Sequence, residues 1–265
     1  MKLHSRSPSL IRFRQRADAR QRLFCFPYAG APAAIFRDWS EKLDPDIEVW
    51  TVEYPGHGTR RSETPLKQLS QLVDALLPDI RQELVSPFAF FGHSMGAIVA
   101  FEILKRLATE AEPKPVCFFV SACYPPWKER RRAPIHDLPE SEFVGQVRSL
   151  GGTPEELLAN RELAQLFLPV LRADFEVART YSHSSDKLSC PVFAYGGLDD
   201  PEASREDLSE WNSVCPTALV QMFPGGHFFL HSAAEDLMQV LARDFSRRVA
   251  EINATSTKSS VAQTA

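Results

Sequence analysis

Hydrophobic residues along the chain gather in short continuous runs that alternate with longer segments of helical periodicity. A short apolar run bounded by turn residues is typical of a strand that is buried on both faces, as in parallel sheets. Helices between such strands predict a wound, mostly parallel sheet with right-handed crossovers, which is an α/β fold. We expect strands at 23–26, 48–52, 88–91, 117–121, 191–195 and 218–223, and helices near 33–43, 67–84, 95–109, 201–211 and 232–249.

Residues 125–187 interrupt this alternation, because they contain helical patterns and no recognisable strand. Helices are expected at 138–150, from Pro154 onward, and near 161–182, and the Gly-Gly-Thr-Pro sequence at 151–154 predicts a hinge. An all-helical insertion at this place is expected to form a lid over a pocket at the sheet edge. The core is then divided into 23–124 and 188–250.

The two ends of the chain differ from the core in composition. Residues 1–22 contain seven Lys or Arg and a single acid, Asp18, which predicts a basic arm that is either solvated or half-ordered against the body. Residues 251–265 are mostly small and polar, and we expect a disordered tail there.

Length and composition narrow the class of protein. With 265 residues and 44% hydrophobic content, the chain suits one globular domain with a modest insertion. A net charge of -4 and a pI of about 6.0 argue against a nucleic-acid-binding protein. Neither a transmembrane run nor an apolar signal core is present in the sequence, so we expect a cytoplasmic protein.

Cysteine usage gives no reason to expect a metal. The five cysteines are scattered, without a CxxC pair, and suit small buried side chains. Cys123 follows a strand and either lines a site there or packs in the core. We expect neither metal nor cofactor.

The sequence Gly92-His93-Ser94-Met95-Gly96 carries the clearest chemistry. An apolar run precedes it and an amphipathic helical pattern follows, which predicts a strand, a tight turn and a helix with Ser94 at the apex. This arrangement is the nucleophile elbow of the α/β hydrolases, and it exposes the serine hydroxyl at the carboxyl end of a strand. The alternative is a glycine-rich turn that only caps a helix.

A serine nucleophile needs a general base, and on this fold the base is a histidine late in the chain. His227 fits best, because it follows the last expected strand and the turn Pro224-Gly225-Gly226. His231 is a nearby competitor, and His93 is expected to point away from the site. The seven histidines are His4, His57, His93, His136, His183, His227 and His231. His57 follows the strand at 48–52 in a loop rich in glycine and proline that should lie on the catalytic edge, where it either touches substrate or, by default, is exposed to solvent.

The triad acid should follow the strand at 191–195, where Asp199 and Asp200 compete. The hydrolase spacing of a glycine, two residues and an aspartate selects Asp199. Asp200 would then cap a helix opened by Pro201. The oxyanion hole should use the backbone N–H of Met95, after the nucleophile, and that of Ala29, in the loop after the first core strand.

Taken together, these motifs resemble the type II thioesterases, the free-standing editing enzymes of polyketide and nonribosomal peptide assembly lines. The resemblance covers residues 23 to 249, with Ala31 and His57 standing where the family often has glycine and arginine. It rests on Phe26-Pro27-Tyr28-Ala29-Gly30, Tyr54-Pro55-Gly56, the elbow, Phe119-Val120-Ser121, Leu150-Gly151-Gly152-Thr153-Pro154, Leu168-Pro169 with Leu171-Arg172-Ala173-Asp174, and Pro224-Gly225-Gly226-His227-Phe228.

The resemblance implies a function and a set of partners. The enzyme would hydrolyse acyl groups from the phosphopantetheine arm of acyl or peptidyl carrier proteins and so remove aberrant or stalled units. The family's triad falls on Ser94, Asp199 and His227, its oxyanion donors fall on Ala29 and Met95, and the family suggests a monomer. Arg130, Arg131 and Arg132 could dock an acidic carrier protein, although a charge run of this kind is most often simply solvated.

Two other classes of function stay open on sequence alone. A carboxylesterase, or an acyltransferase or cyclase, uses the same fold and triad. The second class is a binding protein on an inactive hydrolase scaffold, but such proteins usually lack a triad member.

Overall fold

The computed structural model describes residues 7–108, 113–128, 133–181 and 187–263, with only the backbone from residue 256 onward. Within these residues, one sheet contains seven strands in the order β1-β3-β2-β4-β5-β6-β7. All neighbouring strands are parallel except β1, which is antiparallel to β3. The strands are β1 Leu10–Ile11, β2 Gln21–Phe26, β3 Ile47–Val52, β4 Phe88–His93, β5 Cys117–Ser121, β6 Val192–Gly197 and β7 Ala218–Phe223.

The centre of this sheet is buried on both faces, as the apolar runs predict. Every residue of β3, β4, β5 and β6 is buried. Phe90 on β4 is in register with Phe24 and Phe118 on the neighbouring strands, and the rings of Phe24 and Phe90 lie 5.4 Å apart. The six strands expected from sequence are therefore confirmed, and so is the α/β fold.

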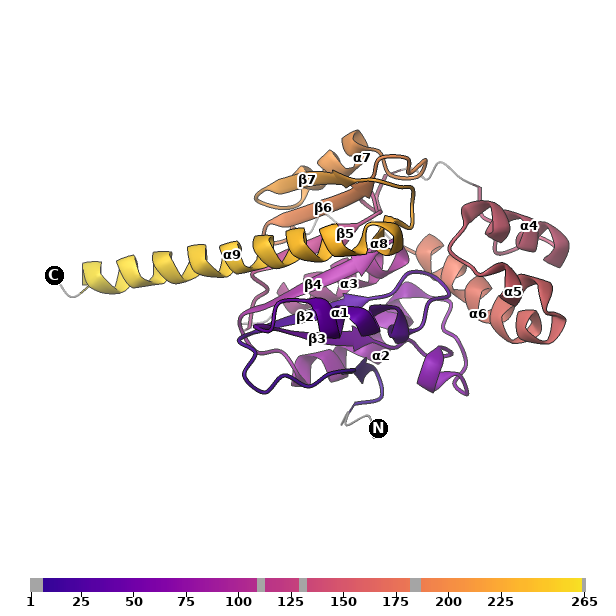
Figure 1. Cartoon of the computed structure of the whole chain (residues 1–265), viewed down its shortest axis with the longest axis horizontal. Coiled ribbons are helices and arrows are strands. Elements are labelled where there is room, and N and C mark those ends of the chain that lie inside the picture. Colours follow the sequence, from indigo (N-terminus) through magenta and orange to yellow (C-terminus); the bar gives the residue numbers. More distant parts are fainter. Residues whose placement is uncertain (1–6, 109–112, 129–132, 182–186, 264–265) are drawn as a thin grey trace.

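Helices cover both faces of the sheet (Figure 1). One apolar cluster joins the sheet to α2, α3 and α7, and the other joins it to α1, α8 and α9. These helices are α1 Arg37–Lys42, α2 Leu69–Gln82, α3 Met95–Ala108, α7 Arg205–Ser209, α8 Phe229–Ser232 and α9 Ala234–Gln263, with short 3-10 turns at Ala33–Phe36, Gly58–Arg60 and Glu210–Ser213.

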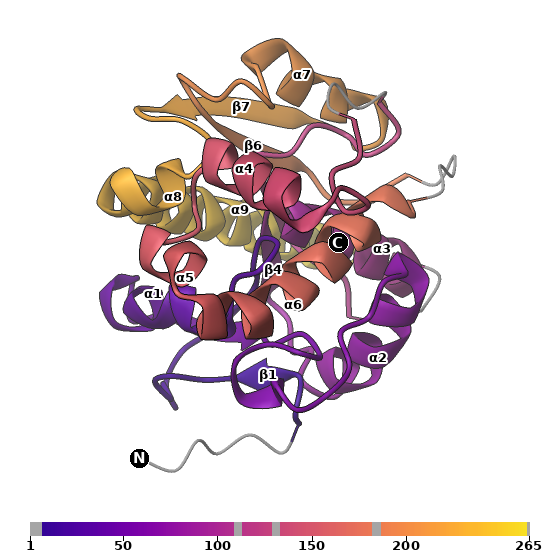
Figure 2. The same cartoon turned by 90° about the vertical axis from the view of Figure 1, so that its right-hand side faces the viewer.

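Three further helices separate β5 from β6, where the sequence predicts the insertion. They are α4 Glu140–Leu150, α5 Glu155–Ala159 and α6 Arg161–Arg179. They lie together at one end of the sheet, as Figure 2 shows from that side. Their facing sides form a separate apolar cluster of Phe143, Val147, Leu158, Ala164, Leu168 and Leu171.

Two expectations about element boundaries are wrong. The helix expected from Pro201 begins only at Arg205, because Ser204 caps it through a reciprocal pair of hydrogen bonds with Asp207. The tail expected to be disordered continues α9 as far as Gln263, in a stretch without glycine or proline to end the helix.

For the basic arm, the structure favours the alternative in which it is ordered against the body. Leu10 and Ile11 pair with β3 and are buried, and the ring of Phe13 is largely buried as well. The Arg16 guanidinium donates to several main-chain carbonyl oxygens at the end of α1, among them that of Leu43 at 3.0 Å. The apolar side chains between the basic residues therefore dock this segment on the core.

Across the described ranges, no helix combines the length and the apolar character that a bilayer crossing requires.

Candidate active site

The nucleophile elbow forms where β4 passes into α3. Ser94 has a φ of 52°, a left-handed conformation that is rare for a residue with a side chain. The two glycines are needed for close packing, because a Cβ on Gly92 would lie 2.5 Å from the Ala97 backbone and one on Gly96 would lie 2.2 Å from the Phe26 carbonyl oxygen. The sequence thus permits a turn that no larger residue would allow at these two positions.

Main-chain hydrogen bonds hold this turn in place. The Ser94 N–H donates to the Ser121 carbonyl oxygen on β5 at 2.8 Å, and the Ser94 carbonyl oxygen accepts from Ala97 N–H at 3.0 Å. Met95 is the first residue of α3, so helix geometry provides no acceptor for its N–H. That amide, and the positive end of the helix dipole, are therefore available to an anion beside Ser94.

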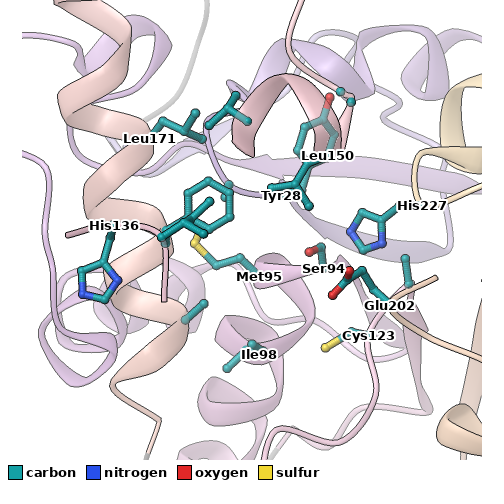
Figure 3. A pocket seen from close by; sticks show the side chains of 18 of the residues that line it. Tyr28, Ser94, Met95, Ile98, Cys123, His136, Leu150, Leu171, Glu202 and His227 are labelled. Atoms are coloured by element: carbon teal, nitrogen blue, oxygen red, sulfur yellow. The ribbon is translucent and has the colours of Figure 1, made fainter. Parts of the chain in front are cut away.

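His227 lies in the loop between β7 and α8 and shares a cavity with Ser94. Its Nδ1 lies 2.9 Å from Oδ2 of Asp200, whose side chain is 0% exposed, whereas the His227 side chain is 17% exposed. A carboxylate at Nδ1 favours the tautomer with hydrogen there, which leaves Nε2 as a proton acceptor. Figure 3 shows Ser94 and His227 beside each other at the cavity.

The selection of Asp199 as the acid is contradicted by this geometry. The Asp200 N–H donates to the Gly197 carbonyl oxygen at 3.3 Å, so Leu198 and Asp199 occupy the two central positions of a turn and are exposed. Asp200 follows the turn and is directed inward, where its Oδ1 also accepts from the Glu202 N–H at 2.8 Å. The same glycine spacing, counted from Gly197 instead of Gly196, selects Asp200.

The loop that contains Ala29 lies against the elbow. The Ala31 N–H donates to the Tyr28 carbonyl oxygen at 3.0 Å, and this bond closes a turn with Ala29 and Gly30 at its centre. Ala29, Ser94, Met95 and His227 all line the same cavity. The structure therefore brings together both expected oxyanion donors, the serine and the histidine.

Two other imidazoles lie close to His227, and their surroundings differ from its own. His93 is fully buried, its Nδ1 is 2.8 Å from Ser121 Oγ, and its ring centroid is 5.4 Å from that of His227. Burial, together with the charges of His227 and His231, holds the pKa of His93 well below its usual value.

His231 bonds to the Tyr28 hydroxyl through Nε2 at 2.9 Å, and burial lowers its pKa as well. Of these three imidazoles, it is His227 whose ring bonds to a carboxylate. This contact favours His227 as the candidate base, which is also the histidine that its position in the chain suggests.

The cavity beside Ser94 has a volume of about 180 Å³ and is enclosed by the core on one side and the insertion on the other. Its walls are mostly apolar. They include Ile98 of α3, Val147 and Leu150 of α4, and Leu171 and Phe175 of α6. Cys123 lines the cavity and also packs in the apolar core cluster, so both expectations for this residue hold (Figure 3). Such a cavity suits an acyl chain.

Among the described residues, no three His, Cys, Asp or Glu side chains come together as a metal-binding group.

Two further expectations concern His57 and the arginines at 130–132. His57 was expected to touch substrate or, by default, to be exposed at the catalytic edge, but it is buried and its Nε2 lies 2.9 Å from Asp174 Oδ2 on α6. Sequence reasoning missed this carboxylate, although it lies in one of the quoted motifs. The arginines at 130–132 lie outside the described residues, so their docking role stays a hypothesis.

Comparisons with known proteins agree with this geometry. The family described as "Thioesterase domain" matches residues 21–245. The chain is 37% identical over 227 residues to the gramicidin S biosynthesis protein GrsT of Aneurinibacillus migulanus, covering 85% of this chain and 89% of that one.

Other relatives give the same result. Thioesterase PikA5 of Streptomyces venezuelae is 37% identical over 233 residues, covering 83% of this chain and 79% of PikA5. Among solved structures, the type II thioesterase BorB from the borrelidin biosynthetic cluster superposes with a TM-score of 0.83 at 32% identity, covering 91% of this chain and all (100%) of BorB. The family resemblance inferred from the motifs is thus confirmed.

Proposed function

Because the chain belongs to the thioesterase family, we propose that it hydrolyses acyl thioesters on the phosphopantetheine arms of acyl or peptidyl carrier proteins, and that Ser94 is the nucleophile. Its relatives are named for the biosynthesis of gramicidin S and for the borrelidin cluster, which supports an assembly-line setting. In that setting the enzyme removes aberrant or stalled acyl units.

Acylation begins with the thioester carbonyl carbon beside the Ser94 hydroxyl. His227 Nε2 takes the serine proton as Oγ attacks, and Asp200 stabilises the resulting imidazolium through the hydrogen bond at Nδ1. The N–H groups of Ala29 and Met95 donate to the oxyanion. The carbon–sulfur bond then breaks, and the imidazolium gives its proton to the phosphopantetheine thiolate as it leaves.

Deacylation repeats these steps with water. His227 removes a proton from a water molecule that attacks the acyl-Ser94 carbonyl, and the same two amides stabilise the second oxyanion. The carboxylic acid leaves and Ser94 recovers its proton. Each proton taken by His227 is therefore returned within the same half-reaction.

The insertion is proposed to act as the lid of this site. Helices α4 and α6 provide much of the apolar wall opposite Ile98 and Met95, so the acyl chain would lie between the core and the insertion. The phosphopantetheine arm must then reach Ser94 along the edge of the insertion.

The hydrogen bond between Asp200 and His227, behind Ser94 in a shared apolar cavity, is the observation that carries this proposal. It supports a working serine hydrolase over a binding protein on an inactive scaffold, because burying a carboxylate behind a histidine is costly and serves to orient a catalytic base.

Mass spectrometry of loaded carrier proteins tests the proposal. Carriers bearing acetyl, propionyl and longer chains are incubated with the wild type and with Ser94→Ala. Release of free carrier by the wild type alone supports the proposal, and the order of rates gives the acyl preference. Carriers that stay loaded while small esters are cleaved would replace it with a carboxylesterase. Transfer of the acyl group to an added amine or alcohol would indicate an acyltransferase.

A monomeric state and a cytoplasmic location belong to the same proposal. Light scattering after size exclusion tests the first, and fractionation of the producing cells tests the second.

A further inference from the structure

Asp174 on α6 joins the insertion to the loop that provides an oxyanion donor. It is buried, and its Oδ2 accepts two hydrogen bonds, from the Gly30 N–H at 2.6 Å and from His57 Nε2 at 2.9 Å. These three groups come from three separate parts of the chain: α6, the loop after β2 and the loop after β3. One oxygen atom thus holds three elements together beside the site.

The His57 ring fixes the charge state of this contact. Its Nδ1 lies 3.1 Å from the carbonyl oxygen of Pro55, which can only accept, so Nδ1 carries a hydrogen. Nε2 faces the carboxylate and also donates, so the pair holds an imidazolium against a carboxylate. Burial by itself lowers the pKa of His57, but the charge and hydrogen bond of Asp174, aided by the Pro55 carbonyl, outweigh it and raise that pKa.

Gly30 is pressed directly against α6. Its φ of 78° is the left-handed value required at the third position of a turn such as Tyr28–Ala31. A Cβ at Gly30 would lie 2.7 Å from Leu171 Cδ1 and 3.0 Å from the Phe167 ring. The turn that presents the Ala29 N–H therefore has α6 as its immediate support.

The rest of this loop is held from the core. The Tyr54 hydroxyl donates to the Pro27 carbonyl oxygen at 3.0 Å, and the carboxylate of Glu53 accepts from the Ala33 N–H at 2.8 Å. Both residues lie in the loop that directly follows β3, on the core side of the site. Asp174 differs from them because its helix belongs to the insertion.

We propose that Asp174 is a positioning residue, which sets the Ala29 N–H toward the oxyanion only while α6 is seated against the core. His57 in turn holds the carboxylate in the position from which it accepts the Gly30 N–H. Seating of the lid and completion of the oxyanion hole are then one event. This inference rests on the proposed Ser94 mechanism.

The same helix provides a matched control. Glu176 lies two residues beyond Asp174 and pairs with Lys67 at 3.2 Å, so it also ties α6 to the core but does not touch the oxyanion loop. Glu176→Gln removes a charge and a tie from α6. Asp174→Ala removes the acceptor, while Asp174→Asn keeps the shape and one acceptor oxygen.

Steady-state hydrolysis of a short acyl-N-acetylcysteamine thioester measures the effect, with Ser94→Ala as the blank. We expect kcat to fall about 100-fold in Asp174→Ala and about 10-fold in Asp174→Asn, with KM changed less than about 2-fold, since a misplaced donor weakens only the transition state. Glu176→Gln should stay within about 2-fold of the wild type. A fluorophosphonate should still label every Asp174→Ala molecule, but more slowly.

Several results would overturn the inference. These are a kcat for Asp174→Ala equal to that of Glu176→Gln, a loss confined to KM, or a loss explained by an unlabelled, unfolded fraction. If Asp174→Ala does not fold, a wild-type kcat in Asp174→Asn overturns it equally. An active Ser94→Ala would instead refute the serine mechanism, and carriers that stay loaded while the small thioester is cleaved would refute only the carrier substrate.

Discussion

The sheet core and the helical insertion are stabilised in different ways, and they contribute different residues to the candidate site. The central strands are buried on both faces and joined by large aromatic rings. The insertion has a cluster of six buried side chains, and α6 alone continues into the core cluster, through Val177. A large core resists local opening, whereas a small satellite cluster does not.

The division of the functional groups follows this difference. Ser94, Asp200 and His227 all lie on loops at the ends of core strands, where the sheet fixes their separation. The insertion contributes walls of the acyl cavity and the carboxylate of Asp174. The candidate catalytic groups therefore lie on the region with the large apolar core, and part of the cavity wall lies on the region with the small one. Four experiments test this contrast.

The largest expected effect concerns the two adjacent aspartates of the core. Asp200→Asn should lower kcat by about 10³- to 10⁴-fold, because an amide cannot stabilise the imidazolium and favours the wrong tautomer. Asp199→Asn is the matched control, since its exposed side chain lies on the same turn. We expect it to stay within about 3-fold. Single-turnover hydrolysis of a thioester measures both, and a reversal of the two results would restore Asp199 as the acid.

Truncation of one buried phenylalanine in each region compares their stabilities. Phe90→Ala in β4 should lower the free energy of unfolding by about 3–5 kcal/mol, because the surrounding sheet cannot collapse around the cavity. Phe143→Ala in α4 should cost less in global unfolding and should speed amide hydrogen exchange within 140–179. Urea unfolding and exchange mass spectrometry are the measurements. Faster exchange in the strands of Phe143→Ala would mean that the two regions open together.

The buried pair of His57 in the core and Asp174 in the insertion should make the stability of the fold depend on pH. The pKa of His57 is raised in the folded state above the ordinary histidine value of about 6.5, so the folded protein binds the proton more tightly than the unfolded chain. The contribution is complete below about pH 6.5 and is lost as the pH rises through the raised pKa. His57→Gln should therefore reduce the Tm most at pH 6 and less at pH 9. A difference that grows with pH would contradict the ion pair.

The smallest effect is expected on the outer surface of the insertion. Leu166 on α6 is 75% exposed, so Leu166→Ser should change the free energy of unfolding by no more than about 0.5 kcal/mol. Activity on small thioesters should also be unchanged. A larger loss of stability would show that this face of α6 is covered in solution.

The sequence allowed the strands, the elbow and the place of His227 beside Ser94 to be predicted, because each has a local pattern. Unbroken apolar runs mark β4 and β5, and the glycines of the elbow permit one particular turn. The choice between Asp199 and Asp200 failed because Gly196 and Gly197 give the same spacing to each. The choice depends on which residues of the turn face solvent, and only the structure shows that these are Leu198 and Asp199.

Other features depend on contacts between distant residues. His57 was expected to be exposed because its loop is rich in glycine and proline, but its burial depends on Asp174, 117 residues further along the chain. The docking of residues 10–13 depends likewise on β3, and two paired residues are too few to give a periodic signal. Pairings of this kind carry no trace in a single sequence.

The length of α9 has a practical consequence. The helix runs past the edge of the sheet, and Figure 1 shows its final turns and the insertion at opposite ends of the molecule. A label, an affinity handle or a solid support attached at the C-terminal end of α9 would stand well away from the acyl cavity. Enzyme immobilised in this way would keep its lid facing the solution, so arrays of this protein could be assayed on a surface with the activity of the free form.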